Sequence, residues 1–494
     1  MVEVIIVSLY VFCLVCILVY CLSEVNLALN YRKYKKNNTA PLRSLPKDLP
    51  SEKYPYVTVQ LPIFNEMYVV ERLVDAITAF DYPKSRLQIQ ILDDSTDETV
   101  NISAAKVAEY QAQGFDISLI HRIDRKGYKA GALQEAMPQV KGEFIAIFDA
   151  DFIPKPDFLL QTLPYFEEEK MGVVQTRWEH INKNYSLLTQ IQAFFIDAHF
   201  TVEQTGRNVS GYFMNFNGTA GVWRKATIID AGGWQADTLT EDLDLSYRSQ
   251  MKGWQFKYLE DVTSPSELPA DMRAFKTQQF LWIKGCAETA VKILPRIAKT
   301  DLPKNIKFNA FSHLLSSSIY IVIFLSAILT VPLLLVKNSF IEHDYIKYGS
   351  LFFLTNFAVG FVYFTAIRNI EETLGKSLKT FFYILPSFLA ITLGLSLHNA
   401  LAALRGLAGE KTPFVRTPKF NITSASDIWH NKKYTSREIE FLTIVEAFFV
   451  CYFSVGIFLS FKLQSFELLP FYILATIGFG MTFWYSMKHA KVVK

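Results

Sequence analysis

The sequence Leu-Gln-Ile-Gln-Ile-Leu-Asp-Asp-Ser-Thr-Asp at 87–97 joins a run of strand-forming residues to a cluster of carboxylates, and Phe-Ile-Ala-Ile-Phe-Asp-Ala-Asp at 144–151 repeats this arrangement. Short apolar runs of this kind are typical of strands buried in a parallel sheet. Ligands of such sheets bind outside the carboxyl ends of the strands. The acidic residues at these ends are therefore the first candidates for a site: Asp93, Asp94, Asp149 and Asp151.

Between residues 55 and 275 the chain alternates such runs with helical patterns. The expected strands are 56–61, 87–92, 117–121, 143–148 and 172–177, and the clearest helices are 66–80 and 97–113. Strands that alternate with helices predict an α/β domain in which helices cover both faces of a mostly parallel sheet.

Hydrophobic runs dominate the rest of the 494 residues, of which 50% are hydrophobic and only 20% are charged. A run of about 19 to 23 apolar residues can cross roughly 30 Å of hydrocarbon. We expect an N-terminal anchor at 1–23 and further spans at 314–336, 348–367, 441–461 and 468–487. Glu446 interrupts one of these runs, and we interpret it as a glutamate that reaches toward the membrane boundary. The expected fold class is therefore α/β, combined with an α-helical transmembrane bundle.

Basic residues flank these runs in a way that predicts their orientation. The linker 24–54, the segment 405–437 and the tail 488–494 are rich in Lys and Arg, so all three are expected in the cytoplasm. These three cytoplasmic assignments are compatible with one another only if the run at 380–404, which Pro386 interrupts, lies at the membrane interface or re-enters it. We therefore predict five crossings, because a sixth would put the basic segment outside.

Charge and cysteine content exclude several classes of protein. A net charge of +3 leaves no large basic surface for nucleic acid. Five cysteines, most of them in apolar runs, form neither a disulfide framework nor a zinc ribbon. A transporter rarely devotes so much of its chain to one cytoplasmic domain, and no inverted repeat is visible in the sequence. A catalytically silent scaffold would be expected to have lost acidic residues at the strand ends, and this sequence has them at both ends.

Each polar cluster admits a functional and a structural interpretation. The carboxylates at strand ends could bind Mg²⁺ or Mn²⁺ together with substrate phosphates. In the structural interpretation, Asp93 and Asp94 only turn the chain and cap a helix. Thr240-Glu241-Asp242 either caps a helix or supplies a general base. The glycine-containing basic segment 125–131 suits phosphate oxygens or is a solvated turn. Trp282, in an amphipathic stretch at 276–310 that is expected to lie on the membrane surface, is an interfacial residue or a platform for a sugar ring.

Six motifs, in this order, resemble those of membrane-embedded family 2 glycosyltransferases, which include the cellulose, chitin and hyaluronan synthases. The motifs are Pro62-Ile-Phe-Asn65-Glu66, Leu-Asp93-Asp94-Ser-Thr-Asp97, Lys129-Ala-Gly-Ala-Leu, Asp149-Ala-Asp151, Thr240-Glu241-Asp242 and Gln278-x-x-x-Trp282. Longer matches, such as Phe-Asn-Gly-Thr-Ala-Gly-Val-Trp-Arg at 216–224, look most like the cellulose-synthase-like A group, the β-mannan and glucomannan synthases. The resemblance extends over residues 55–420 and implies a GT-A domain at 55–275.

The resemblance implies a role for each motif. Pro62, Asn65 and Glu66 would line the base pocket, Asp93 and Asp94 would bind the nucleotide or its sugar, and Lys129 would meet the diphosphate. Asp149 and Asp151 would form the metal-binding pair, with Asp151 the main ligand of Mg²⁺ or Mn²⁺. Asp242 is the implied catalytic base, and Thr240, Glu241, Gln278 and Trp282 would hold the acceptor. Arg416 and Lys419 resemble the gating loop that closes over the bound nucleotide.

The sequence departs from the family pattern at one position. In the Gln-x-x-Arg-Trp signature of the family, Leu281 stands where an arginine would neutralise diphosphate charge. Lys284 lies three residues on, on a similar face of the helix, and is the candidate to supply that charge.

The resemblance implies an inverting, metal-dependent hexosyltransferase that uses GDP-mannose or UDP-glucose. It would extend a β-linked polysaccharide and extrude it, whereas the alternative is an enzyme that adds one sugar to a membrane lipid. The implied partners are the nucleotide-sugar, a glycan or lipid acceptor, the bilayer, and a second copy or an accessory subunit. We expect a multi-pass membrane protein with a cytoplasmic catalytic domain, in the plasma membrane of a prokaryote or the Golgi of a plant.

Overall fold

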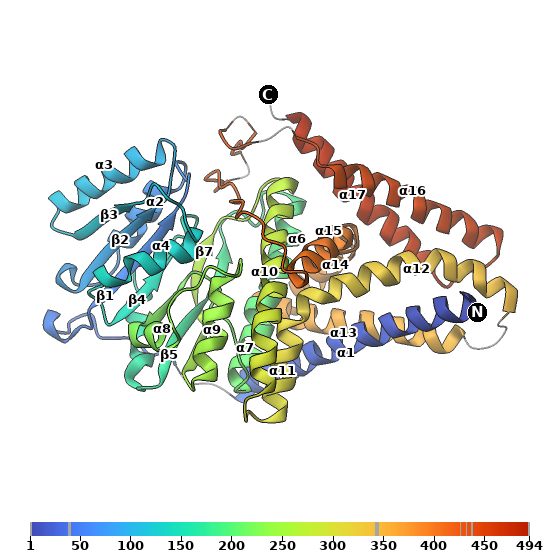
Figure 1. The fold of residues 1–494 in the computed structure, drawn as a ribbon, viewed down its shortest axis with the longest axis horizontal. Coiled ribbons are helices and arrows are strands. Elements are labelled where there is room, and N and C mark those ends of the chain that lie inside the picture. The colour runs from blue at the N-terminus through green and yellow to red at the C-terminus, as the bar shows by residue number, and fades with distance from the viewer. Residues whose placement is uncertain are drawn as a thin grey trace.

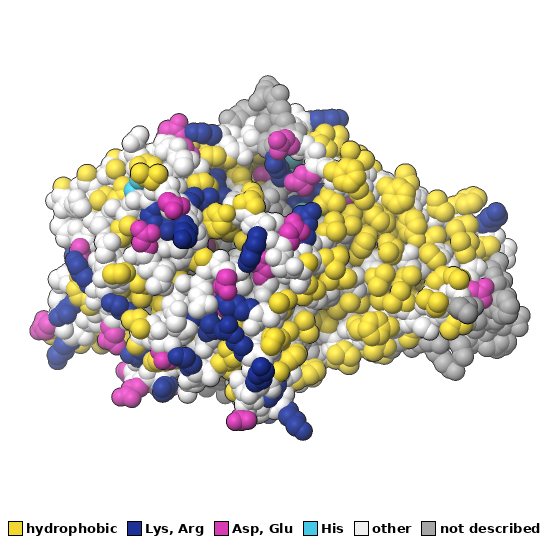
Figure 2. Space-filling model, viewed as in Figure 1, with side chains coloured by type: hydrophobic (Ala, Val, Ile, Leu, Met, Phe, Trp, Pro, Cys, Tyr) yellow, Lys and Arg dark blue, Asp and Glu magenta, His cyan; other side chains and the backbone are white. Residues whose placement is uncertain are grey.

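The protein divides into an α/β domain and a bundle of long helices, which extend to opposite sides in Figure 1. The computed structural model describes residues 2–37, 41–340, 345–424, 426–430, 432–435 and 438–492, with the side chains of 337–340, 345–353 and 492 left out. Hydrophobic side chains cover most of the bundle surface in Figure 2, whereas charged side chains are scattered over the α/β domain. This contrast separates a face suited to lipid from a face suited to water.

A seven-stranded sheet with the order β3-β2-β1-β4-β6-β5-β7 forms the centre of the α/β domain. Its strands are β1 (Val57–Ile63), β2 (Leu87–Asp93), β3 (Asp116–His121), β4 (Phe144–Ile147), β5 (Met171–His180), β6 (Gly221–Arg224) and β7 (Gln255–Ser266). Only β6 runs antiparallel to its neighbours, so the sheet is mostly parallel, as predicted. The five expected strands are confirmed, and β6 and β7 were not predicted.

The strand order brings the two acidic strand ends together. β1 pairs in parallel with β2 on one side and with β4 on the other, and Ile63 lies opposite Asp93. The carboxyl ends of β2 and β4 therefore flank the end of β1. The sequences that follow them, with Asp94 and Asp149, start at the same edge of the sheet.

Helices cover both faces of this sheet. They are α2 (Val70–Thr78), α3 (Thr99–Ala112), α4 (Tyr128–Ala136), α5 (Phe158–Thr162), α6 (Leu187–Ala198), α7 (Gln204–Val209), α8 (Lys225–Asp230) and α9 (Glu241–Met251). One core contains Val59, Ile89 and Phe158, and a second core contains Leu133, Ile145 and Trp223. Because successive side chains of a strand point to opposite faces, β4 contributes Ala146 to the first core and Ile145 to the second.

The connection to the bundle is made by α10 (Met272–Ala298) and α11 (Lys304–Leu314). Asp271 caps α10, since its carboxylate accepts a hydrogen bond from the backbone N–H of Ala274 at 2.9 Å. Helix α10 packs against α9 of the α/β domain and against α15 (Ser396–Leu407) of the helical part. It therefore fixes the position of the bundle relative to the sheet.

The other long helices are α1 (Val2–Asn37), α12 (Ile319–Phe340), α13 (Tyr345–Ile370), α14 (Leu374–Gly394), α16 (Phe441–Lys462) and α17 (Leu469–Val492). Within the described residues, four helical segments are long and apolar enough to cross a membrane: Val2–Asn37, Ser316–Val336, Leu374–Gly394 and Phe441–Lys462. Helix α1 continues without a break to Asn37, so the first part of the expected linker 24–54 is helical instead.

The run at 380–404 contains two helices that meet at Leu395. Helix α14 has the length and composition of a span, but Ile384, Phe388 and Ile391 pack in one cluster with Leu188 and Ile191 of α6. Both α14 and α15 lie where the bundle meets the α/β domain in Figure 1. The number of crossings stays a prediction.

Glu446 corrects one expectation. It does not reach toward the membrane boundary, because it is only 1% exposed and accepts a hydrogen bond from Nζ of Lys276 on α10 at 2.6 Å. The same ammonium group donates to Ser486 of α17 at 3.0 Å. A buried pair of this kind joins α10, α16 and α17, and the loss of one partner would leave an uncompensated charge.

Candidate active site

The two aspartates at the end of β2 are buried and play different parts. Asp94 accepts two hydrogen bonds of 2.7 Å from the guanidinium group of Arg122, a bidentate pair that fixes the loop after β2. Asp93 accepts one bond from the backbone N–H of Ser95 at 2.8 Å. Its other oxygen has no hydrogen-bond partner within the described part of the chain. That oxygen lies 3.7 Å from Nδ1 of His121, so Asp93 is oriented by Ser95 and His121, and Asp94 anchors the loop.

The loop after β1 is tied to the loop after β2. Asn65 has a φ of 53° and donates its backbone N–H to Oγ of Ser95 at 2.8 Å, while its side-chain oxygen accepts from the N–H of Thr96. Asparagine tolerates this left-handed backbone better than most residues. Pro62 is half-buried at the carboxyl end of β1. The guanidinium group of Arg125 lies over the ring of Phe64, with Cζ of Arg125 3.2 Å from the centre of that ring. This stacked pair was not predicted from the sequence.

Lys129, Asp149 and Asp242 gather beside Gly218. Nζ of Lys129 donates to Oδ1 of Asp149 at 2.5 Å and to the carbonyl oxygen of Gly218 at 2.9 Å. A methyl group built on Gly218 would lie 3.1 Å from Oδ2 of Asp242 and 3.4 Å from Nζ of Lys129. Three residues predicted from three separate motifs are thus in one place.

The charges of this group depend on one another. Although burial lowers the pKa of Lys129, the carboxylates of Asp149 and Glu241 raise it to about 12, so the ammonium group is charged. Burial raises the pKa of Asp149 in spite of Lys129, and the nearby Asp151 raises it further. The group therefore carries more negative charge than Lys129 neutralises, which favours the binding of a cation.

Asp242 lies in the first turn of α9, where Oδ1 accepts a hydrogen bond from the N–H of Leu243 at 2.8 Å. Burial and then the repulsion from Glu241 raise the pKa of the Asp242 carboxyl to about 7, against the opposing effect of Lys129. A carboxylate with a pKa near the working pH is well suited to act as a general base. Thr240 does not cap α9 through its side chain and contacts Oγ1 of Thr289 instead.

The segment that contains Arg416 and Lys419 lies across the same edge of the sheet. Lys419 donates to Oδ2 of Asp151 at 2.6 Å and to the carbonyl oxygen of Glu267 at 3.0 Å. Arg416 donates to the carbonyl oxygen of Phe64 at 3.2 Å and lies 4.0 Å from Oε1 of Glu66. Burial raises the pKa of Glu66 to about 8, although Arg416 opposes it. Residues more than 250 positions apart in sequence thus meet at the expected nucleotide site.

The residues present fit a divalent cation that is shared with a ligand. Asp149 and Asp151 offer hard oxygen atoms two residues apart, and Mg²⁺ or Mn²⁺ is usually held by one or two carboxylates together with substrate phosphates. Across the described residues, no group of three His, Cys, Asp or Glu side chains could hold a metal by itself. Ion pairs with Lys129 and Lys419 occupy one oxygen of each aspartate. The second oxygen of each aspartate would be left for a cation, with the diphosphate supplying further oxygen ligands.

Helix α10 places Trp282 but not Lys284 at the site. Trp282 lines a cavity together with Thr240 and Asp242. Lys284 is fully buried and donates to Oε1 of Glu288 at 2.5 Å and to the carbonyl oxygen of Glu410 at 2.6 Å. The hypothesis that Lys284 supplies the cation missing at Leu281 is therefore wrong, because its ammonium group is already enclosed by these two partners.

Two neighbours of the predicted residues were missed. Gln279, rather than Gln278, lines the cavity beside Trp282, and Oε1 of Gln278 is buried without a hydrogen-bond partner among the residues described. Lys411 lines a smaller pocket with Lys129 and Glu241. Nothing in the sequence pattern indicates Lys411, because its position depends on how the segment after α15 folds back.

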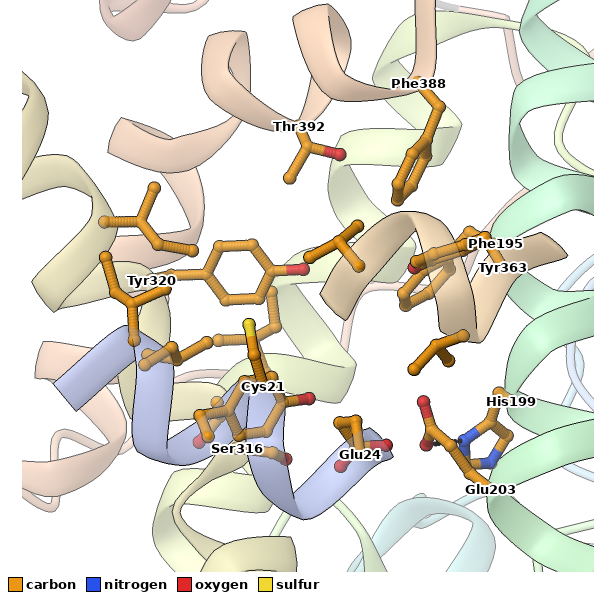
Figure 3. Close-up of a pocket in the computed structure, with 18 of the residues that line it drawn as sticks. Cys21, Glu24, Phe195, His199, Glu203, Ser316, Tyr320, Tyr363, Phe388 and Thr392 are labelled. Atoms are coloured by element: carbon orange, nitrogen blue, oxygen red, sulfur yellow. Dashed lines mark hydrogen bonds and ion pairs between the residues drawn. The ribbon is translucent and has the colours of Figure 1, made fainter. Parts of the chain in front are cut away.

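The cavity beside Asp242 leads from the α/β domain into the helical bundle. It has a volume of about 470 Å³ and is lined near the sheet by Asp242, Trp178 and Trp282, and in the bundle by Tyr10 and Thr330. Figure 3 shows its middle part, where Tyr320 and Tyr363 face the polar group of Glu24, His199 and Glu203. A single space therefore connects the proposed base with helices that are apolar enough to enter a membrane.

Comparisons with known proteins agree with this geometry. Residues 55–285 match the family model described as "Glycosyltransferase like family 2". Glucomannan 4-beta-mannosyltransferase 1 of Oryza sativa subsp. japonica is 35% identical over 412 residues, which make up 79% of this chain and 74% of that protein. The chain therefore belongs to glycosyltransferase family 2.

Within that family the chain is similar to the glucomannan 4-beta-mannosyltransferases, the cellulose-synthase-like A group. Glucomannan 4-beta-mannosyltransferase 2 of Arabidopsis thaliana is 42% identical over 267 residues, 53% of this chain and 49% of that protein. Probable glucomannan 4-beta-mannosyltransferase 4 of Oryza sativa subsp. japonica is 41% identical over 282 residues, 56% of this chain and 51% of that protein. The chain is thus matched over about half the length of these two relatives.

A solved structure shares the fold. The mannosyltransferase from Pyrobaculum calidifontis, in complex with GDP-Man and Mn²⁺, superposes with a TM-score of 0.51 at 18% sequence identity, over 81% of this chain and 100% of that chain. The α/β domain is a GT-A domain, as the resemblance of the motifs implied.

Proposed function

We propose that this protein is an inverting, metal-dependent hexosyltransferase that extends a β-linked polysaccharide and passes the product into the membrane. The observation that carries the proposal is the cavity in which Asp242 and Trp282 share one space with residues of the helical bundle. A soluble transferase has no need of such a space, whereas a polymer-forming enzyme must give its product a way out of the site.

The proposed reaction is a single displacement. Asp242 takes the proton from the acceptor hydroxyl group, whose oxygen attacks the anomeric carbon from the face opposite the diphosphate. The bond between the anomeric carbon and the diphosphate breaks, and the nucleotide diphosphate leaves with the electron pair. Since one displacement inverts configuration, an α-linked donor gives a β-glycoside. One base suffices, unlike the paired carboxyl groups of glycosidases.

Positive charge around the leaving group supports this reaction. Lys129 is held 2.5 Å from Asp149 and would donate hydrogen bonds to the leaving diphosphate. A divalent cation bound by Asp149 and Asp151 would add positive charge at the same place. Lys411 lines the pocket that contains Lys129, and Arg416 lies 4.0 Å from Oε1 of Glu66, so both would contribute further positive charge. This supply compensates for the missing arginine at Leu281.

The names of the curated relatives favour mannose as the sugar. The relatives are glucomannan 4-beta-mannosyltransferases, so GDP-mannose is the first donor to test and UDP-glucose the second. In the proposed arrangement the protein crosses the membrane several times, with the GT-A domain in the cytoplasm. The relatives are plant proteins, so we propose a Golgi-type membrane, or the plasma membrane in a prokaryote. A second copy or an accessory subunit is a proposed partner.

The test is a donor screen that reads out product size. Purified protein with Mn²⁺ or Mg²⁺ receives radiolabelled GDP-mannose, UDP-glucose and other nucleotide-sugars, and the products are separated by solubility and mass. A ladder or an insoluble β-linked polymer that is absent with Asp242→Asn supports the proposal. A chloroform-soluble lipid with one sugar would contradict the polymerase and favour the lipid acceptor. Release of nucleotide without any glycosidic product would contradict both.

A further inference from the structure

A polar group of four side chains lies in the cavity, apart from the residues to which the reaction is assigned. It consists of Glu24 of α1, His199 and Glu203 of the π-helix His199–Glu203 between α6 and α7, and Arg207 of α7. Figure 3 shows Glu24, His199 and Glu203 turned toward the same end of the cavity, below Tyr363. We call these residues the product-side group. Its role rests on the proposed function, since it concerns a binding step on the product side of that site.

The backbone brings this group together in two ways. A π-helix inserts an extra residue into a helix and is frequent at functional sites, and here it ends at Glu203. One turn later, a Cβ atom at Gly206 would lie 2.7 Å from the carbonyl oxygen of Leu27. Glycine at this position lets α7 and α1 approach closely, because a larger side chain would clash with the backbone of α1. The carboxylate of Glu24 therefore lies 3.7 Å from Nη2 of Arg207.

The hydrogen bonds on one side of the group are well satisfied. Nδ1 of His199 lies 2.8 Å from Oε2 of Glu203, and Nδ2 of Asn217 lies 3.1 Å from Nε2 of His199. The imidazole ring thus bridges the carboxylate of Glu203 and the side-chain amide of Asn217. Although burial raises the pKa of Glu203, His199 and Arg207 hold it below its usual value, so this carboxylate is ionised. His199 and Asn217 thereby fix Glu203 in one orientation.

The other side of the group is buried but not satisfied. Glu24 is only 7% exposed, and its Oε2 has no hydrogen-bond partner in the described part of the protein. Arg207 is 3% exposed, and its Nε and Nη1 also have no hydrogen-bond partner among the described residues. Buried charged groups without partners are costly. Both residues line the cavity, so a ligand with hydroxyl groups that enters the cavity would satisfy them.

The group lies next to the acceptor position along a row of aromatic rings. The ring centres of Trp282 and Trp178 are 6.4 Å apart, those of Trp178 and Phe200 are 4.7 Å apart, and those of Phe200 and His199 are 5.0 Å apart. Flat apolar faces followed by the ionised carboxylate of Glu203 and the carboxyl group of Glu24 suit a sugar, whose ring has apolar C–H faces and hydroxyl groups at its edge. A metal is the less suitable ligand, since no three-residue metal group occurs among the described residues.

We propose that Glu24, Glu203 and His199 form a second sugar subsite, which binds the hydroxyl groups of a hexose unit of the nascent chain on the product side of Trp282. The carboxylate of Glu203 accepts a hydrogen bond from one hydroxyl group of the sugar, and such a charge-assisted bond is stronger than a neutral one. The carboxyl group of Glu24 bonds to a neighbouring hydroxyl group. The unused N–H groups of Arg207 donate to further hydroxyl oxygens. The subsite retains the chain between additions, so it determines the length of the product.

The test measures binding without turnover and then product length. The full-length protein in detergent, without nucleotide-sugar, is titrated with β-(1→4)-linked mannotetraose and cellotetraose, and the fluorescence of Trp178 and Trp282 reports binding. The variants are Glu24→Gln and Glu203→Gln. The matched control is Cys21→Ala, since Cys21 lies one turn before Glu24 on α1 and lines the same cavity with a weak hydrogen-bonding group.

We expect each Gln variant to bind the tetrasaccharide about tenfold more weakly or worse, because a hydrogen bond between the carboxyl group and the sugar is lost, while Cys21→Ala binds like the wild type. The Gln variants also make shorter products, and their KM for the nucleotide-sugar changes less than their KM for the oligosaccharide. Glu203→Asp, which keeps the charge, restores part of the affinity and shows that loss is not due to misfolding. Equal tetrasaccharide affinity in wild type and both Gln variants would overturn the subsite. Polymer synthesis by the wild type would in that case leave the proposed function standing.

Discussion

The pH dependence of sugar transfer is the sharpest consequence of the burial of Asp242. Its carboxyl group has a pKa raised to about 7, mainly because the residue is buried and faces Glu241. A group with this pKa is deprotonated in about a tenth of the molecules at pH 6, about half at pH 7 and about nine-tenths at pH 8. Because a general base must be deprotonated to act, kcat/KM is expected to rise roughly tenfold per pH unit below pH 6.5 and to level off above pH 8.

The variants Lys129→Met and Asp242→Asn test the origin of this rise of kcat/KM with pH, the acidic limb of the profile. Lys129 lowers the pKa of Asp242, so Lys129→Met shifts the limb to higher pH in addition to any loss of rate. Asp242→Asn removes the base, which is expected to lower the rate by roughly 10² to 10⁴ and to abolish the limb. Asp48→Asn, in an exposed turn before the sheet, is the control and keeps the wild-type profile.

The assay is nucleotide release coupled to product formation, followed from pH 5.5 to pH 9 in one buffer series at constant ionic strength. Circular dichroism of each variant shows that the helices are intact. A flat profile between pH 5.5 and pH 8 would refute the reasoning, because an ordinary aspartate with a pKa of about 4 is fully ionised over that range. Full activity of Asp242→Asn would remove this residue from the role of base.

Contacts at the same edge of the sheet lead to three more predictions. Lys419→Met frees an oxygen of Asp151, so the nucleotide-free variant should bind Mn²⁺ more tightly than the wild type in a titration followed by electron paramagnetic resonance; weaker binding would show that Lys419 does not compete with the metal. Arg122→Leu removes both hydrogen bonds from the guanidinium group to the buried carboxylate of Asp94 and leaves it only the longer 3.9 Å ion pair with Arg125 among the described residues, which should lower the free energy of unfolding by roughly 3 kcal/mol, and an unchanged thermal midpoint would contradict this. Gly218→Ala puts a methyl group 3.1 Å from the base at a φ of +77°, so activity should fall while the helical circular dichroism persists; wild-type kcat would show that this approach is not needed.

The sequence predicts those parts of the fold that are visible in short stretches. The first five strands are short runs rich in β-branched and other apolar residues, and each has its place in the sheet. β7 was missed because it contains charged residues such as Glu260. That residue is buried among distant partners: Tyr31 of α1 and Asn369 of α13 donate to it at 2.9 and 2.6 Å, and Nζ of Lys35 lies 3.2 Å away. Partners this distant in sequence leave no local pattern.

In the candidate site, too, the residues that form short motifs were predicted, and the contacts between distant segments were not. Asp149, Asp242 and Lys129 were predicted because a carboxylate at a strand end, the Thr240-Glu241-Asp242 triplet and a lysine before a helix are motifs of a few residues each, and the fold brings these motifs together. The role of Lys284 was predicted wrongly, since helical spacing shows only which face a residue occupies and not the partner that faces it. The contact between Lys419 and Asp151 depends on a segment more than 250 residues away, and only the folded chain reveals it.

The most direct test of the central claim, that sugar transfer at Asp242 delivers its product into the cavity of the bundle, is cryo-electron microscopy of the protein during turnover. Wild-type protein in a lipid nanodisc is incubated with GDP-mannose and Mn²⁺ and frozen before the chain is released. We predict density for linked pyranose rings that begins on Trp282, passes Glu203 and continues between α1, α12 and α13. Glycan density on the outer surface of the GT-A domain, with the cavity occupied by lipid alone, would contradict the claim.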